Sequence, residues 1–175
     1  MARLVMTFVG DDRPGLVNAM SEAIAARGGT WLESRSARLA GKFAGILLVG
    51  IADENVIPLE KDLAELLPKG LRVSIDRGAS IEEPEGRLIK LDVVGQERPG
   101  IVRDVTQALT KLGVNIEEFA SGLEGAPFTG ETMFRATARL SAPPDVTTGD
   151  IRKALERLAG EIMVDLTVGE EGSPA

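Results

Sequence analysis

The sequence of 175 residues contains no cysteine, no histidine and no tyrosine, and it has a single tryptophan. Without cysteine no disulfide framework is possible, and the chain is expected to be cytoplasmic. Without histidine or cysteine the Ser-His-Asp and Cys-His mechanisms of acyl transfer are excluded. Zinc sites lose their usual nitrogen and sulfur ligands. We therefore expect no metal site, and acid–base chemistry would depend on Asp, Glu or Lys alone.

Positive charge is also scarce, because 20 Lys and Arg stand against 27 Asp and Glu and give a formal net charge of −7. Surfaces that bind DNA need clustered Lys and Arg to replace counterions, and the basic residues here are scattered among acids. No apolar run reaches membrane-spanning length, and no signal peptide is recognisable. We expect no direct contact with nucleic acid and no membrane association.

What the sequence does contain is one stretch of nine residues that occurs twice. Residues 9–17 read VGDDRPGLV, and residues 94–102 read VGQERPGIV. Such a spacing is too long for a solenoid repeat and suits a small domain. Residues 78–86 are rich in Gly, Ser, Pro and Glu, as linkers are. The sequence predicts a domain over residues 1–78, a linker over 79–86, a second domain over 87–169 and a tail over 170–175.

Hydrophobic periodicity predicts the same order of elements in both halves: strand, helix, strand, strand, helix, strand. The predicted fold class is α+β, with two ferredoxin-like βαββαβ domains, each an antiparallel sheet with its helices on one face. Thr147 followed three residues later by Asp150 predicts a capping box. The helix before Pro68 is predicted to bury one apolar face, formed by Leu59, Leu63, Leu66 and Leu67, and the last helix one formed by Ile151, Leu155 and Leu158.

The repeated turn between the first strand and the first helix has the chemistry of a small binding site. Gly10 permits a sharp turn, Pro14 sets the φ of a first helical turn, and Gly15 leaves the backbone bare. The unpaired amides of the helix start favour a carboxylate. Neighbouring polar residues can receive an ammonium group, and together these features describe a free α-amino acid. The same residues also suit a helix start without any ligand, and that alternative stays open. The polar neighbours are Asp11 and Asp12 in the first turn, and Gln96 and Glu97 in the second.

At these turns, and at residues 113–118 (GVNIEE), the sequence resembles the ACT domain family of ferredoxin-like modules that sense amino acids. The resemblance covers residues 3–77 and 87–169. It implies that ligands bind where two such domains meet, with the first turn of one domain and the strand after the first helix of its neighbour. The ligand-binding residues that it implies are Gly10, Asp11, Asp12, Arg13, Pro14, Gly15, Leu16 and Thr30 in the first copy, and Gly95, Gln96, Glu97, Arg98, Pro99, Gly100, Ile101 and Asn115 in the second.

The first copy departs from the family at Thr30, where an Asn is frequent, so the two pockets need not be equivalent. The resemblance implies a regulatory protein rather than an enzyme, with no cofactor, because the two copies leave no catalytic segment. It implies a small amino acid as ligand, glycine or serine, and a protein partner such as a transcriptional activator. A homodimer is expected, because small domains lean on one another. The alternative is an ACT-type dimerisation or docking module without a ligand.

Overall fold

The computed structural model describes residues 1–78, 86–125, 132–157 and 162–168, and for the last of these ranges only the backbone. The chain divides into two compact units, residues 1–82 and 83–175. Each unit is described on its own. The predicted linker and tail fall largely outside the described residues, as do Leu158 and the residues between 125 and 132.

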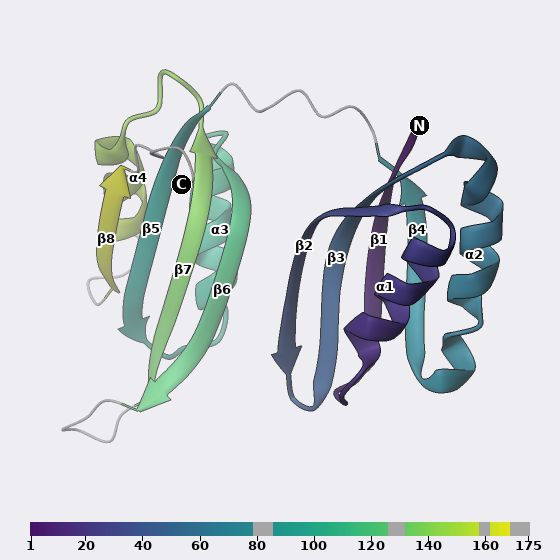
Figure 1. The fold of residues 1–175 in the computed structure, drawn as a ribbon. Coiled ribbons are helices and arrows are strands. Elements are labelled where there is room, and N and C mark those ends of the chain that lie inside the picture. The colour runs from purple at the N-terminus through teal and green to yellow at the C-terminus, as the bar shows by residue number, and fades with distance from the viewer. Residues whose placement is uncertain (79–85, 126–131, 158–161, 169–175) are drawn as a thin grey trace. The chain divides into compact units, whose positions relative to one another are not determined.

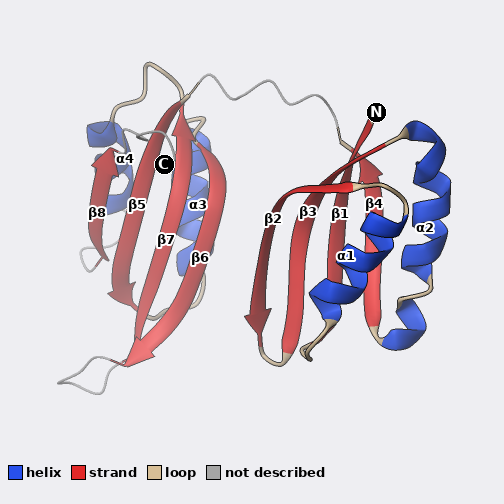
Figure 2. Ribbon diagram, viewed as in Figure 1, coloured by secondary structure: helices blue, strands red, loops and turns tan. Residues whose placement is uncertain are grey.

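The first unit is a four-stranded antiparallel sheet with both helices on one face (Figures 1 and 2). The order of strands in the sheet is β2-β3-β1-β4. Two short 3₁₀ turns, η1 (Asp53–Asn55) and η2 (Leu67–Lys69), flank the second helix. The regular elements are β1 (Ala2–Asp11), α1 (Leu16–Ala26), β2 (Thr30–Leu39), β3 (Lys42–Ile51), α2 (Val56–Ala64) and β4 (Leu71–Arg77).

The second unit repeats this arrangement, with the strand order β6-β7-β5-β8. The predicted ferredoxin-like fold is thereby confirmed in both halves of the chain. Its elements are β5 (Arg87–Gln96), α3 (Ile101–Lys111), β6 (Asn115–Gly125), β7 (Thr132–Ala142), α4 (Thr148–Glu156) and β8 (Ile162–Val168).

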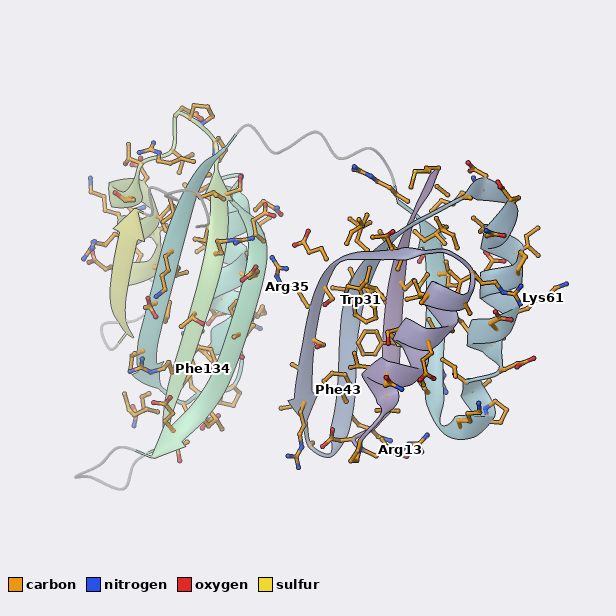
Figure 3. All side chains as sticks on the ribbon, viewed as in Figure 1. Arg13, Trp31, Arg35, Phe43, Lys61 and Phe134 are labelled. Carbon is orange, nitrogen blue, oxygen red and sulfur yellow. The ribbon has the colours of Figure 1, made fainter. Side chains whose placement is uncertain are left out.

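Alternation along the central strands builds the core. In β1, Leu4, Met6 and Phe8 are buried beneath the helices, while the residues between them face the other side of the sheet, as the two-residue period of a strand requires. The helix α1 covers them with Leu16, Met20 and Ile24, which recur once per turn. Trp31 and Phe43, labelled in Figure 3, pack against the same core. The result is one buried face and one open face per sheet.

The helix ends agree with the sequence in one place and differ in another. The capping box is confirmed: Thr147 Oγ1 accepts from the Asp150 amide at 3.1 Å, and Asp150 Oδ2 accepts from the Thr147 amide at 3.0 Å. The prediction for Leu67 is wrong. Leu66 is buried, but Leu67 is 56% exposed, because α2 ends at Ala64 and Leu67 opens a 3₁₀ turn, whose tighter winding shifts side chains away from the helical stripe.

Candidate functional site

Each repeated turn ends at a glycine that starts a helix in a left-handed conformation. Gly15 has φ 93° and Gly100 has φ 86°, and no side chain caps either helix. The free amides of the first helical turn therefore face outward at the positive end of the helix dipole. A Cβ built on Gly15 would meet no atom within 4 Å. This is an open, electropositive corner that can receive a small anionic group.

Other residues of the first turn hold the backbone in place. The Asp12 amide donates to the Gly41 carbonyl at 2.9 Å, which ties the turn to the hairpin between β2 and β3. The Arg13 guanidinium, at the lower end of the unit in Figure 3, donates to the Lys69 carbonyl. A Cβ at position 10 would lie 2.7 Å from the Gly70 carbonyl oxygen. Gly10 and Arg13, which the sequence predicts to bind ligand, thus help to hold the turn against the segment before β4.

The two acids of the first turn already have cations of their own. Lys42 forms an ion pair with Asp11, and its hydrogen bond holds the pKa of Asp11 below the ordinary value. Arg38 Nε lies 2.8 Å from Asp12 Oδ2. The sequence predicts that these two carboxylates bind the ammonium group of a ligand. In the structure they instead pair with Arg38 on β2 and Lys42 on β3. The sequence analysis did not predict either partner. The pairing of Asp11 with Lys42 follows from the register of β1 and β3, which sets the two residues opposite one another.

The second turn offers a different set of groups. Arg98 Nη1 is bound to Asp104 Oδ2 at 2.7 Å, and this contact is the main cause that lowers the pKa of Asp104. A Cβ on Gly100 would lie 3.1 Å from Arg103 Nη2, so this guanidinium borders the corner. Within the described residues no ion pair involves Glu97, whose amide donates to the Thr132 carbonyl at 3.2 Å.

The two corners are therefore not chemically equivalent. At the second one the exposed guanidinium of Arg103 lies beside the helix amides, and its Nε and Nη2 donate to Asp104 Oδ1 at 3.0 and 2.9 Å. In the first copy the position of Arg103 is taken by Asn18, whose amide donates to Glu22 Oε1 at 2.7 Å. The second corner offers a guanidinium beside the helix amides and has Glu97 in the same turn, whereas the first offers only the helix amides.

Thr30 and Asn115 lie far from the turn of their own domain. Thr30 pairs with Gly50, which pairs with Arg3 near the start of β1, whereas the turn follows the end of β1. At about 3.3 Å per residue the separation along the strand is roughly 26 Å. Asn115 has the same place in β6 and donates to Glu117 Oε1 at 2.7 Å. Their role in ligand binding stays a prediction.

No group of three or more Asp and Glu residues is placed to hold a metal ion in the part of the chain that the structure describes. Among the same residues, no helix has the length and apolar character needed to cross a membrane.

Comparison with known proteins identifies the family. Residues 2–76 match the model of the ACT domain. A crystal structure of an unknown protein from Galdieria sulphuraria is 33% identical, covers 94% of this chain and 96% of that one, and superimposes with a TM-score of 0.83. Residues 2–76 thus belong to the ACT domain family, and the second half of the chain repeats the same fold and turn.

Two further relatives are similar in sequence or fold. Phosphoserine phosphatase SerB2 of Mycobacterium tuberculosis is 30% identical over 178 residues, which is 97% of this chain but 41% of that protein. The chain thus spans less than half the length of this curated relative. A crystal structure assigned as a glycine cleavage system transcriptional repressor shares the fold, with a TM-score of 0.69, 16% identity, and coverage of 96% of this chain and 98% of that one.

Proposed function

We propose that this chain is a non-catalytic regulatory protein that binds a small amino acid, glycine or serine, at its helix-start corners. It then regulates transcription through a protein partner, such as a transcriptional activator, without touching DNA. The observation that carries the proposal is the pair of left-handed glycines, Gly15 and Gly100, each opening onto helix amides that no side chain caps.

The second corner is the stronger of the two sites in this proposal. A ligand carboxylate is received by the amides of Val102 and Arg103 and by the guanidinium of Arg103. This guanidinium already donates from Nε and Nη2 to Asp104 Oδ1, so the ligand shares it with Asp104. The ammonium group is received by Glu97, for which the described residues supply no ion pair. The choice of glycine or serine comes from the names of the relatives and not from the shape of the corner.

Action through a protein partner is supported by charge and by the relatives. The net charge is −7, and the basic residues are scattered along the sequence among acids, whereas binding to nucleic-acid phosphates requires clustered Lys and Arg. The names of two relatives connect this fold with serine phosphate and with glycine. The proposal transfers the sensing of a small amino acid from them, and no catalysis.

Isothermal titration calorimetry with a panel of amino acids tests the proposal. Glycine or serine is expected to bind, and Arg103→Asn, which gives the second corner the residue of the first, is expected to weaken binding about tenfold through loss of a charged hydrogen bond. The matched control is Asn18→Ala, which should leave the stronger site unchanged. At a concentration one hundred times its dissociation constant, the ligand should stabilise the fold by about 2.7 kcal/mol. If no amino acid gives heat or a thermal shift, the proposal is wrong and the docking alternative takes its place.

A further inference from the structure

The open faces of the two sheets have opposite character, although the fold is the same. In the first unit the centre of the open face is apolar, with Ile46 47% exposed and Val9 39% exposed. Strand register assigns an equivalent position in the second unit to each residue. Val5, Ile46 and Leu48 correspond in this way to Lys90, Thr137 and Arg139.

The second unit shows that this fold does not require an apolar open face. Its charges are satisfied across the sheet: Arg139 is 3.2 Å from Glu118, and Arg135 is 3.3 Å from Glu124. To cover that face with protein would desolvate these ion pairs, which is unfavourable. On the open face of the first unit the central strands β1 and β3 carry apolar residues in place of these charges, and a contiguous apolar patch of this kind marks an interaction site. Charged residues flank the patch on β2, where Arg35 stands opposite Ile46 and pairs with Glu33 at 2.7 Å.

On β1, β3 and β4 the residues of the first unit's open face are complementary about a central row, which continues on β2 with Arg35, between Glu33 and Ala37. Thr7 on β1 pairs with Ile46 on β3, and residues two positions away on each side of this row face the same way. On one side lie a large apolar residue, a valine and an acid, and on the other a small apolar residue, a valine and a base. They are Leu48, Val5 and Asp76, and Ala44, Val9 and Arg72.

We infer that this face binds a second copy of the chain, about a two-fold axis that crosses the strands at Thr7 and Ile46. The rotation sets Leu48 of one copy over Ala44 of the other, and Val5 over Val9. It also sets Asp76 over Arg72 twice, once in each direction, as an isologous interface demands. Within the described residues, no ion pair involves either of these two charged side chains. The strands of the two sheets stay aligned, which is a favoured packing of sheets.

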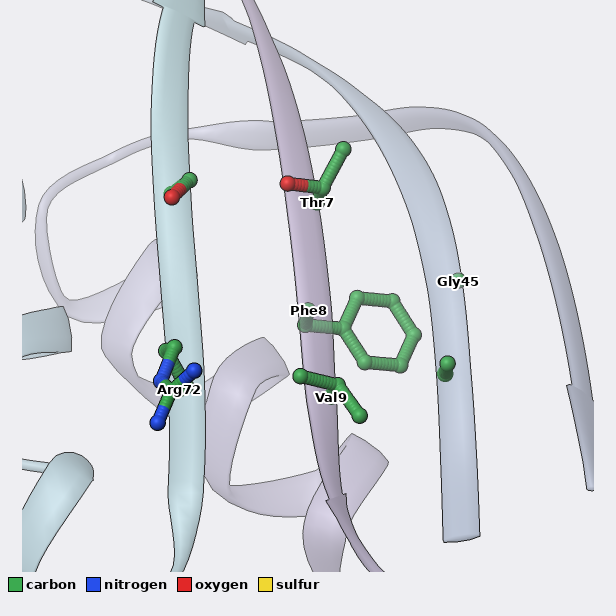
Figure 4. A pocket seen from close by; sticks show the side chains of 7 residues that line it. Thr7, Phe8, Val9, Gly45 and Arg72 are labelled. Carbon is green, nitrogen blue, oxygen red and sulfur yellow. The ribbon is translucent and has the colours of Figure 1, made fainter.

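A hollow in the face supports this arrangement. A cavity of about 300 Å³ opens at one side of the centre, where the small side chain of Ala44 leaves space on β3. Figure 4 shows Thr7 and Val9 on β1 and, on the neighbouring strand β4, the side chain of Arg72 beside Val9. This is the place over which the rotation brings Leu48 and Val5 of the second copy. Large side chains of one copy thereby fill the hollow of the other.

Sedimentation velocity over a range of concentrations tests the interface with a matched pair of variants. Ile46→Arg is expected to raise the dimer dissociation constant at least about tenfold, because it buries an unpaired charge at the centre. Thr137→Arg introduces the same residue at the equivalent position of the second unit and should leave the mass unchanged. If wild-type protein is a monomer, or if Ile46→Arg remains as dimeric as wild type, the inference is overturned.

A charge reversal tests the axis itself. Arg72→Asp and Asp76→Arg should each weaken the dimer, since each sets like charges against one another. The double variant R72D/D76R should recover the affinity, because the rotation pairs each residue with the other. A double variant weaker than both single variants excludes this axis.

A triple variant, V5K/I46T/L48R, checks whether loss of the dimer reflects loss of folding. It places on the first sheet the three residues that the second sheet has at the equivalent positions. It should unfold cooperatively and sediment as a monomer, whereas a folded dimeric triple variant contradicts the inference. The test needs no amino acid, so its failure would leave the proposed function untouched.

Discussion

The alpha carbon of Gly10 faces the carbonyl oxygen of Gly70 so closely that a Cβ would approach this oxygen to 2.7 Å. The backbone at the end of β1 and the backbone before β4 thus approach one another so closely that no side chain fits between them. Gly10→Ala is expected to destabilise the fold by about 1–3 kcal/mol, as overpacking does. The control is Gly122→Ala, whose Cβ would meet no atom within 4 Å. Urea unfolding measures both, and equal stability of the two variants would contradict the packing role of Gly10.

Position 15 requires glycine because of its backbone conformation and not because space is short. Because its φ is 93° and its surroundings are open, Gly15→Ala should cost about 1–2 kcal/mol from left-handed strain alone. Gly15→Asn should cost less, since Asn tolerates this conformation better. Chemical denaturation orders the three proteins. If the Ala variant equals wild type, the turn has another conformation in solution.

Acid should weaken the second turn through Asp104. The hydrogen bonds from Arg98, and then from Arg103, lower the pKa of this carboxyl in the folded state. A depressed pKa stabilises the fold at any pH above the unfolded value, and the contribution is lost as the pH falls through the folded value. Asp104→Asn should therefore reduce stability at pH 7 and flatten its decline in the acid range. Unfolding curves between pH 7 and pH 2 test this, and parallel pH profiles would refute it.

The capping box of α4 makes a separate prediction. Thr147→Ala removes the hydroxyl that accepts from the amide of the third helical residue. The expected loss is about 0.5–2 kcal/mol, and it should appear in the unfolding of the second unit. Thr148→Ala, one residue later, should have a smaller effect because that side chain provides no cap. If the order is reversed, the cap has no role in stability.

The fold could be predicted from the sequence because its signals are local. Alternation in β1 and the once-per-turn spacing of Leu16, Met20 and Ile24 each determine an element. The repeated turn then showed that the elements occur twice. The ends of helices depend on backbone geometry and are harder to predict. Leu67 was predicted to be buried, because the hydrophobic pattern does not show that a 3₁₀ turn follows α2.

The candidate site could be predicted only in part. The glycines and the uncapped helix starts follow from the motif, but the partners of its charges come from strands distant in sequence. The pairing of Asp12 with Arg38 depends on the hairpin of β2 and β3. The position of Arg103 beside Gly100 depends on a rotamer at the start of α3. Neither contact has a signal within the nine repeated residues.

The most direct test of amino-acid binding is a titration of ¹⁵N-labelled protein with glycine, followed by nuclear magnetic resonance. We expect the amides of Val102 and Arg103 to shift first and furthest, those of Val17 and Asn18 to follow more weakly, and Arg103→Asn to remove this order. If saturation with glycine and then with serine leaves all four amides unmoved, neither amino acid binds at these corners.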